Sequence, residues 1–176
     1  IAEHDGKSLN PSTAKTVACA KDLPDADIHV AVFAADGAAL AQVAAKLDGV
    51  AKVLQVDDAD HQHPLAALIA PQVAALARDY THVLGPSTTF GKDLMPRVAA
   101  LLGVNQVSDI MQVEGSHRFK RPVYAGNAIL TVEAPADQAP AVKAALIKLA
   151  GSTEGDRLFA APEATGPEIE VSPDSR

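Results

Sequence analysis

Short apolar runs rich in β-branched residues alternate with alanine-rich stretches through the first two thirds of the chain. This alternation predicts strands and helices that right-handed crossovers join into a mostly parallel sheet. Because the apolar runs hold few polar residues, we expect helices on both faces of the sheet. The expected strands lie at 27–35, 51–58, 81–85 and 106–113. The expected helices lie at 11–22, 37–47, 63–80 and 91–102.

Residues that begin and end helices support these boundaries. Asn10 is placed to cap the first helix, and Pro11 occupies its first position. Gly49 and Gly103 follow the second and fourth helices, where glycine commonly ends a helix. Pro71 lies inside the third helix, where it removes one backbone hydrogen bond and crowds the preceding turn. We therefore expect a kink or a split at that proline.

The pattern changes after the fourth expected strand. Residues 118–134 have the pattern of an antiparallel ribbon with a turn at 125–127, and residues 139–150 have that of a helix. From Gly151 onward, proline, glycine, glutamate and threonine accumulate as they do in linkers. The sequence thus predicts an α/β domain over residues 1–150 and a linker or edge extension over residues 151–176.

Composition excludes several classes of function. The 176 residues carry a formal net charge of −7, so the chain can neutralise few phosphates of a nucleic acid. Aromatic residues make up only 3% and tryptophan is absent, which disfavours a base-stacking surface. The single cysteine, Cys19, allows neither an internal disulfide nor a cysteine-rich zinc site. No apolar run reaches the roughly 18–20 residues that span a bilayer. The first residues have the pattern of a strand's end, so we expect further residues before Ile1.

The segment Gly85–Lys92 (GPSTTFGK) is the strongest local candidate for ligand binding. It follows an expected strand and opens an expected helix, whose N-terminus favours anions. It departs from a P-loop, because five residues separate its glycines and Asp93 follows Lys92 where Ser or Thr would be needed. We expect a capped strand-to-helix turn. A stand-alone nucleotide-binding module that uses this turn is the alternative.

The acidic and histidine-containing segment Asp57–His63 (DDADHQH) is a second candidate. Its three carboxylates and two imidazoles could bind a metal, but their spacing matches no defined metal-binding loop. A solvated acidic turn that also caps the next helix explains the segment more simply.

Groups for covalent catalysis have little support in the sequence. Ser87, Ser108 and Ser116 lack the G-x-S-x-G context of a nucleophilic serine. Cys19 falls on an alanine-rich helix, where a buried packing role is expected, and His117 is expected to be exposed at a turn of the ribbon. The residues themselves therefore indicate no catalytic, cofactor-binding or metal-binding site.

Basic residues gather on the expected ribbon of an otherwise acidic chain. Arg118, Lys120 and Arg121 lie close to Tyr124 in the sequence. Such a cationic ribbon could contact a partner protein. A solvated edge whose charges discourage strand aggregation is the equally weighted alternative.

Four stretches of the chain resemble the N-terminal domain of the electron transfer flavoprotein alpha subunit. They are residues 1–4 with 9–20 (LNPSTAKTVACA), 47–56 (LDGVAKVLQV), 80–110 (YTHVLGPSTTFGKDLMPRVAALLGVNQVSDI) and 121–132 (RPVYAGNAILTV). The last two are the most specific in their order and spacing, and together the four run through most of residues 1–134.

The resemblance implies a nucleotide-binding-like, Rossmann-like α/β fold and a non-enzymatic electron carrier. Members of this family pair with a beta subunit, accept electrons from flavin dehydrogenases, chiefly the acyl-CoA dehydrogenases of fatty acid β-oxidation, and pass them to a membrane quinone oxidoreductase. Their FAD is held mainly by a further domain of the alpha subunit, so residues 151–176 would lead toward that domain and no FAD-binding residue is assigned here. The resemblance also implies no nucleic acid partner, no direct membrane insertion, and a cytoplasmic location in a bacterium or, alternatively, the mitochondrial matrix.

Overall fold

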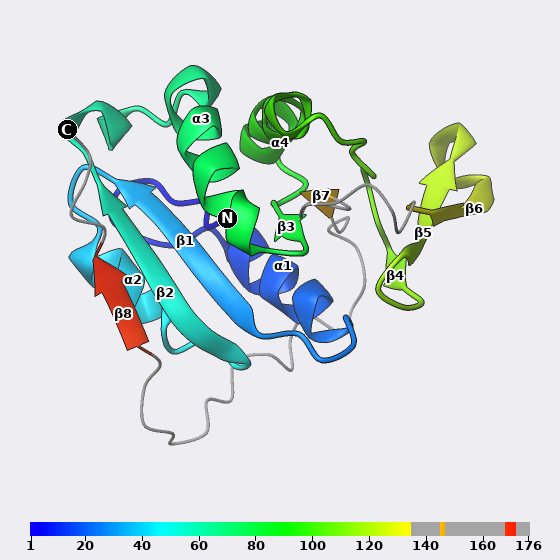
Figure 1. Cartoon of the computed structure of the whole chain (residues 1–176), viewed down its shortest axis with the longest axis horizontal. Helices are drawn as coiled ribbons and strands as arrows, with labels where there is room; N and C mark the ends of the chain where they lie inside the picture. Colours follow the sequence, from blue (N-terminus) through cyan, green and yellow to red (C-terminus); the bar gives the residue numbers. More distant parts are fainter. Residues whose placement is uncertain (135–144, 147–167, 172–176) are drawn as a thin grey trace.

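The computed structural model describes residues 1–134, 145–146 and 168–171, which form an α/β fold (Figure 1). One parallel sheet has the strand order β1–β2–β8, and a second parallel pair joins β3 to β7. The strands are β1 Ile28–Ala34, β2 Val50–Asp57, β3 Val83–Leu84, β7 Ala145–Leu146 and β8 Glu168–Val171. The parallel strands and the helices between them confirm the predicted fold class.

An extended N-terminal segment connects the two groups of parallel strands. The backbone N–H of Ala2 donates to the carbonyl of Ala31 in β1 at 2.9 Å. The amine of Ile1 donates to the carbonyl of Leu84 in β3 at 2.6 Å. The segment therefore lies between β1 and β3 and holds the two groups side by side.

Helices cover both faces of the sheet, as predicted. The helices are α1 Pro11–Lys21, α2 Ala38–Ala44, α3 Ala66–Leu76 and α4 Thr89–Leu102, with 3-10 turns η1 Ala59–Gln62, η2 Ala77–Asp79 and η3 Tyr124–Gly126. Successive side chains of β1 point to opposite faces. Val30 and Val32 pack with α1 and α2, whereas Ala31 and Phe33 pack with α3 and α4. Each face of β1 is thus the wall of a separate apolar core.

Local signals set some helix ends correctly, but the predicted end at Gly49 is wrong, because α2 ends at Ala44 with Ala45 as its C-cap. The Asn10 side chain accepts a hydrogen bond from the Ser12 backbone, and Gly103 ends α4 in a left-handed conformation, both as expected. In contrast, α3 continues through Pro71 and ends at Leu76, so of the predicted kink or split the split is wrong and the kink stays a prediction. Within the described part of the chain, none of the helices has the length and apolar character that a bilayer crossing requires.

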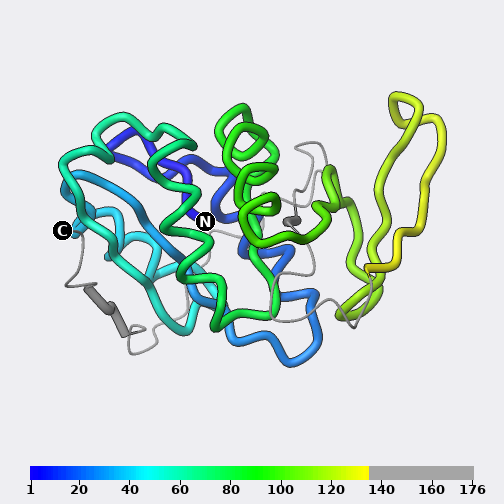
Figure 2. Tube along the Cα trace, turned by 45° about the horizontal axis from the view of Figure 1, so that its top comes forward, coloured from blue at the N-terminus to red at the C-terminus, as the bar shows by residue number. Residues whose placement is uncertain are grey.

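A three-stranded antiparallel ribbon extends away from the parallel sheet (Figures 1 and 2). It comprises β4 Gln112–Val113, β5 Arg118–Val123 and β6 Ala128–Glu133, with the predicted turn between the last two. The predicted strand at 106–113 is wrong, because only its last two residues form a strand and they pair antiparallel with β5. Asp109 has a positive φ of 57°, which interrupts an extended conformation before β4.

Most of the later predictions lie outside the described residues. The predicted helix at 139–150 is described only at Ala145–Leu146, and these two residues form β7 instead of a helix. Of the predicted linker or edge extension at 151–176, only β8 is described, and it pairs in parallel with β2. The division of the chain at residue 150 stays a prediction.

Candidate functional site

The Gly85–Lys92 turn joins β3 to α4, and the hydroxyl groups of its Ser87 and Thr88 donate to the protein's own carboxylates. Thr88 caps α4, because its hydroxyl oxygen accepts a 3.3 Å hydrogen bond from the backbone N–H of Gly91. The same hydroxyl donates to a carboxylate oxygen of Glu3 at 2.7 Å. Ser87 donates to the Asp109 carboxylate at 3.2 Å. The turn is therefore the capped strand-to-helix turn that the sequence indicated.

The two glycines of the turn serve close packing. A Cβ on Gly91 would lie 1.8 Å from the carbonyl oxygen of Pro86, so only glycine permits this approach. A Cβ on Gly85 would lie 2.5 Å from the sulfur of Met95. Steric requirements thus account for both glycines without any phosphate nearby.

Glu3 brings a negative charge to the place where the starts of two helices meet. Its carboxylate oxygen accepts the Ser12 hydroxyl, in the first turn of α1, at 3.0 Å and the Thr88 hydroxyl, at the cap of α4, at 2.7 Å. Helix N-termini attract anions, and here a side chain of the protein supplies the anion. A nucleotide phosphate at this turn would meet Glu3 and Asp109 and be repelled.

The Asp57–His63 segment has structural partners for most of its polar groups. The Asp57 carboxylate accepts from the Gly37 backbone N–H at 2.9 Å and from the Gln55 amide at 2.6 Å. The Asp58 carboxylate accepts from the backbone N–H of Asp60 and caps η1. The predicted capping role therefore applies to this 3-10 turn, whereas Leu65, the N-cap residue of α3, provides no side-chain cap.

His61 departs from the solvated turn that the sequence suggested, because it is only 2% exposed. One ring nitrogen, Nδ1, lies 3.2 Å from the Val56 carbonyl, to which it can donate, and Nε2 lies 3.0 Å from the Gln72 amide nitrogen, from which it can accept. The ring also packs edge-on against Phe33. Both nitrogens are thus engaged, and among the described residues no group of three or more His, Cys, Asp or Glu side chains is arranged to hold a metal ion.

The remaining candidate nucleophiles have positions that explain them structurally. Cys19 is buried in α1, as expected. The carbonyl of Ser116 lies 2.8 Å from the His82 ring, and Ser108 lies in the irregular segment before β4. His117 is half-buried and stacked on His82 with ring centroids 6.5 Å apart, so its expected exposure is wrong.

An open cavity of about 590 Å³ lies between α1, α3, β1 and β3. Its walls are mainly apolar, and a His29–Tyr80 hydrogen bond of 2.7 Å lies at its polar side. The described lining includes the carboxylates of Asp25, Asp27 and Asp79 and holds neither lysine nor arginine. Such a lining suits apolar groups and disfavours a phosphate-bearing ligand.

The ribbon carries an apolar face that the domain covers only at its base. Residues paired directly across antiparallel strands lie on the same face. Phe119 pairs with Val132, and both pack into the core formed with Val107 and Ile110. The next pair on this face, Arg121 with Leu130, lies beyond that core, and the Leu130 side chain is 49% exposed.

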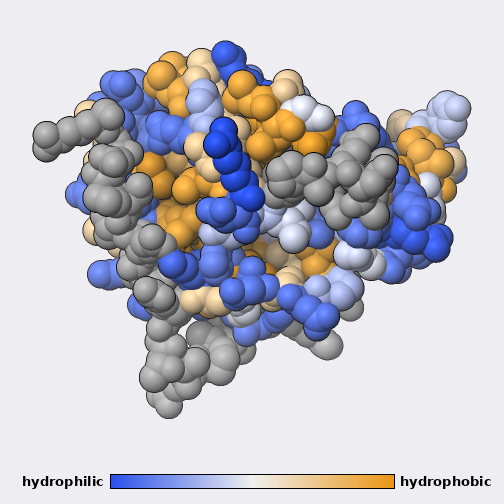
Figure 3. All heavy atoms as spheres, viewed as in Figure 1, coloured by the Kyte–Doolittle hydropathy of each residue, from blue (hydrophilic) through white to orange (hydrophobic). Residues whose placement is uncertain are grey.

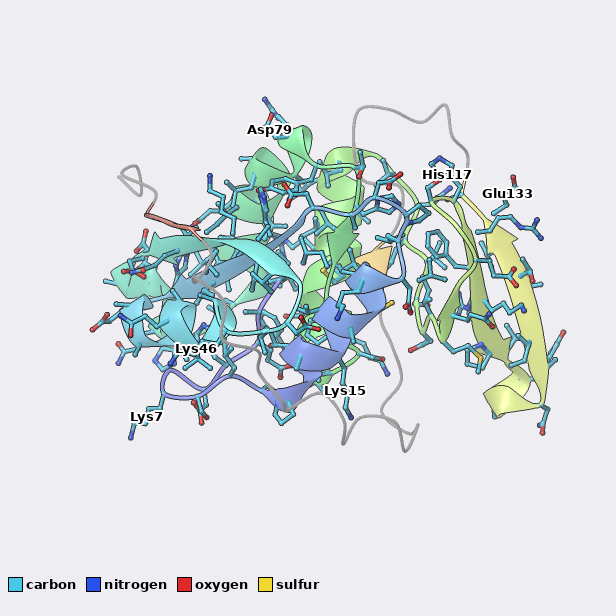
Figure 4. The ribbon with its side chains drawn as sticks, turned by 90° about the horizontal axis from the view of Figure 1, so that it is seen from below. Lys7, Lys15, Lys46, Asp79, His117 and Glu133 are labelled. Atoms are coloured by element: carbon cyan, nitrogen blue, oxygen red, sulfur yellow. The ribbon has the colours of Figure 1, made fainter. Side chains whose placement is uncertain are left out.

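The base of the ribbon joins the domain at the end where His117 and Glu133 lie (Figure 4). There the Ala134 backbone N–H donates to the His117 carbonyl at 2.8 Å. The Lys120 ammonium donates a 2.7 Å hydrogen bond to the Glu114 carboxylate. That contact lowers the pKa of Glu114 below its ordinary value. Of the three predicted basic residues, Lys120 is therefore committed to the ribbon itself.

Comparison with known proteins identifies the family. The family model described as the electron transfer flavoprotein domain matches residues 1–157. The chain belongs to the electron transfer flavoprotein family. The match extends past the four resembling stretches, which end at residue 132.

Several alpha subunits of electron transfer flavoproteins are similar to this chain. That of Pseudomonas aeruginosa is 48% identical over 151 residues, covering 86% of this chain and 47% of the relative. That of Paracoccus denitrificans is 45% identical over 134 residues, covering 76% of this chain and 43% of the relative. The mitochondrial alpha subunit of Dictyostelium discoideum is 40% identical over 140 residues, covering 76% of this chain and 39% of the relative. The chain thus matches less than half the length of these electron transfer flavoprotein subunits.

Membership of a flavoprotein family makes FAD the cofactor to test against the described residues. FAD carries a pyrophosphate, which needs backbone N–H groups or basic side chains. The described lining of the cavity includes carboxylates and neither lysine nor arginine, and the Ser87 and Thr88 hydroxyls of the Gly85–Lys92 turn are bonded to Asp109 and Glu3. Neither place fits a flavin dinucleotide.

Two features escaped prediction from the sequence. Glu3 and Asp109 come to the turn from 85 and 22 residues away, and local spacing carries no sign of such contacts. The ribbon's exposed apolar face had a signal, because Ala128, Ile129 and Leu130 are consecutive apolar residues in an antiparallel strand. Alternation puts such neighbours on opposite faces, so one ribbon face must leave an apolar side chain uncovered unless both are packed.

Proposed function

We propose that this chain is the N-terminal part of an electron transfer flavoprotein alpha subunit and acts as the scaffold that pairs with the beta subunit. The observation that carries the proposal is the family match over residues 1–157, together with relatives that are alpha subunits. In this proposal residues 1–150 form the scaffold, and residues 151–176 lead toward a domain that holds FAD.

The complete protein would be an electron carrier and not an enzyme. It would accept electrons from flavin dehydrogenases, chiefly acyl-CoA dehydrogenases, and pass them to a membrane quinone oxidoreductase. Its location would be the cytoplasm in a bacterium, or alternatively the mitochondrial matrix. The acidic chain supports the absence of a nucleic acid partner.

Placing FAD outside this scaffold has support from electrostatics. The carboxylates of the cavity and of the Gly85–Lys92 turn raise the energy of a bound pyrophosphate. The role left to the described residues is to fix the position of other parts of the assembly.

The stand-alone nucleotide-binding module is the second candidate, and the contact between Glu3 and Thr88 argues against it. Isothermal calorimetry of the chain with AMP and ATP separates the two functions. We expect no heat of binding at millimolar nucleotide. Micromolar binding that Lys92→Ala weakens would replace the proposal with this alternative.

Co-expression with an electron transfer flavoprotein beta subunit tests the scaffold function directly. We expect the complete alpha subunit and the beta subunit to purify together with bound flavin, detected by its visible absorbance. The 176-residue chain incubated alone with FAD should retain none after gel filtration. Stoichiometric flavin on the chain alone, or no association of the complete subunits, would contradict the proposal.

A further inference from the structure

We propose that the turn between β4 and β5, residues 114–117, is a pH-sensitive latch, which His82 holds closed on the domain and which opens when His117 takes up a proton. His82 comes just before β3, so the latch joins the ribbon to the parallel strands. This inference goes beyond the proposed function, because it concerns only how two parts of the chain are joined. Figure 3 shows hydrophilic side chains gathered over the lower end of the projecting ribbon, where this turn lies.

The closed latch has two contacts, and the His82 ring makes both. Its Nε2 donates a 2.8 Å hydrogen bond to the carbonyl of Ser116, across 34 residues of sequence. The ring is also stacked on that of His117, with centroids 6.5 Å apart and 23° between the ring planes. The apolar packing of Phe119 at the ribbon base has no preferred direction, whereas a hydrogen bond has one. The contacts of His82 therefore fix how the turn lies against the domain.

The two rings differ in how they can accommodate a proton. Because Nε2 of His82 donates, its Nδ1 is the nitrogen that can be protonated, and it lies 3.0 Å from the Thr81 hydroxyl oxygen, which can rotate its proton away and accept. In contrast, Nδ1 of His117 is buried and has no hydrogen-bond partner among the described residues. A charged His117 carries an N–H at both nitrogens, so the closed latch would leave one donor buried and unsatisfied. Charge on His82 would add repulsion between the stacked rings.

The charged and titratable groups around the latch attract protons without satisfying His117. Those of the domain line the same cavity as His117, and they are Asp25, Asp27, His29, Asp79 and Tyr80. Their carboxylates attract an imidazolium, although His29 is already bonded to Tyr80 and lies 3.3 Å from Asp27. On the ribbon, Arg118 is paired with Glu133 in the strand register, and Lys120 is bonded to Glu114. None of these groups accepts a hydrogen bond from His117 Nδ1.

Gly115 gives the turn freedom to move. Its φ is 153°, a conformation that residues with side chains rarely adopt, and nothing lies near its Cβ position. In the open turn, water can accept from both N–H groups of a charged His117. The open turn therefore binds a proton that the closed turn cannot accommodate, so the closed state is favoured at higher pH and is lost as pH falls. Histidine changes its charge between about pH 5 and pH 8, which is where the latch should respond.

The test measures amide exchange of the 176-residue chain by NMR at about pH 7.5 and at about pH 5.5, either side of an ordinary imidazole ionisation. The backbone N–H of Ala134 reports on the latch, because it donates to the His117 carbonyl at 2.8 Å. The backbone N–H of Met111 reports on the ribbon outside the latch, because it donates to the Lys120 carbonyl at 2.9 Å. If one proton binds only to the open turn, two pH units can change the protection by up to about a hundredfold.

We expect the protection factor of the Ala134 amide to fall by about tenfold or more at the lower pH, and that of Met111 to change by less than about twofold. In His117→Gln, which cannot become charged, the protection of Ala134 should not depend on pH. His29→Gln, at the same cavity, is the matched control and should keep the dependence. Equal protection of Ala134 at both pH values overturns the inference, as does a pH dependence that His117→Gln leaves intact or that His29→Gln removes.

A second measurement, on the wild type, decides the matter if a variant does not fold. The imidazole signals of His82 and His117 are followed between about pH 5 and pH 8. We expect the nuclear Overhauser effects between the two rings to disappear over the same pH range in which His117 becomes charged and Ala134 loses protection. Contacts between the rings that persist after His117 is charged would overturn the inference.

Discussion

The hydroxyl of Thr88 donates a 2.7 Å hydrogen bond to the carboxylate of Glu3, across 85 residues of sequence. The same carboxylate oxygen accepts the Ser12 hydroxyl at 3.0 Å, so one side chain joins the first turns of α1 and α4. This contact gives a structural role to a turn that has the glycines and the lysine of a nucleotide-binding loop. Substitution of Glu3 can therefore test whether the contact stabilises the fold.

Glu3→Ala should lower the free energy of unfolding by about 1–3 kcal/mol, because two hydroxyl groups lose a charged acceptor. Glu3→Gln keeps one acceptor oxygen and should lose less. Urea unfolding followed by circular dichroism gives both values. Wild-type stability for Glu3→Ala would mean that the carboxylate contributes nothing to joining the helices.

Gly91→Ala should be strongly destabilising, by about 3 kcal/mol, because the new Cβ would meet the Pro86 carbonyl at 1.8 Å. Gly103→Ala is the matched control at the other end of α4. Gly103 has a φ of 67° with nothing near its Cβ position, so only about 1–2 kcal/mol of backbone strain is expected. We therefore expect a lower thermal unfolding midpoint for Gly91→Ala than for Gly103→Ala. A lower midpoint for Gly103→Ala would contradict the packing explanation.

His61→Leu should lower the free energy of unfolding by about 1–3 kcal/mol, because it leaves the Val56 carbonyl and the Gln72 amide without their partner. His63→Leu, at an exposed position, should stay within about 0.5 kcal/mol of wild type. Adding EDTA should leave the wild-type midpoint unchanged. A fall in that midpoint upon chelation would restore the metal interpretation of this segment.

Glu114→Gln tests the ion pair at the base of the ribbon through its pH dependence. Hydrogen bonding to Lys120 lowers the pKa of Glu114 in the folded protein. The stabilisation is therefore present above the pKa of the unfolded chain and is lost as pH falls through the lowered folded value. We expect the urea midpoints of wild type and variant to differ near pH 7 and to converge near about pH 3. A difference that persists in acid would assign the effect to something other than the carboxylate charge.

Features of the fold could be predicted where the residues that determine them lie close together in the sequence. β1, β2 and the four helices were found because their apolar periodicity and capping residues lie within the elements themselves. The strand expected at 106–113 failed at Asp109, whose left-handed backbone interrupts the strand and whose carboxylate accepts a hydrogen bond from the Ser87 hydroxyl. The spacing of the glycines in the Gly85–Lys92 turn argued against a P-loop. The residues that its hydroxyl groups contact, Glu3 and Asp109, come from distant segments and could not be predicted. Contacts that only the tertiary fold creates were beyond the reach of local pattern.

The two apolar cores on either side of β1 also bear on how the strands find their alignment. A slip of one residue exposes apolar side chains when one face of a sheet is wet, but here it would only exchange one core for the other. Hydrophobicity alone therefore cannot select the pairing of Val32 with Gln55. The choice falls to polar groups such as the carboxylate of Asp57 at the end of β2, which accepts a 2.9 Å hydrogen bond from the backbone N–H of Gly37 just after β1. A few hydrogen bonds thus set the register of two strands whose apolar side chains alone would allow more than one.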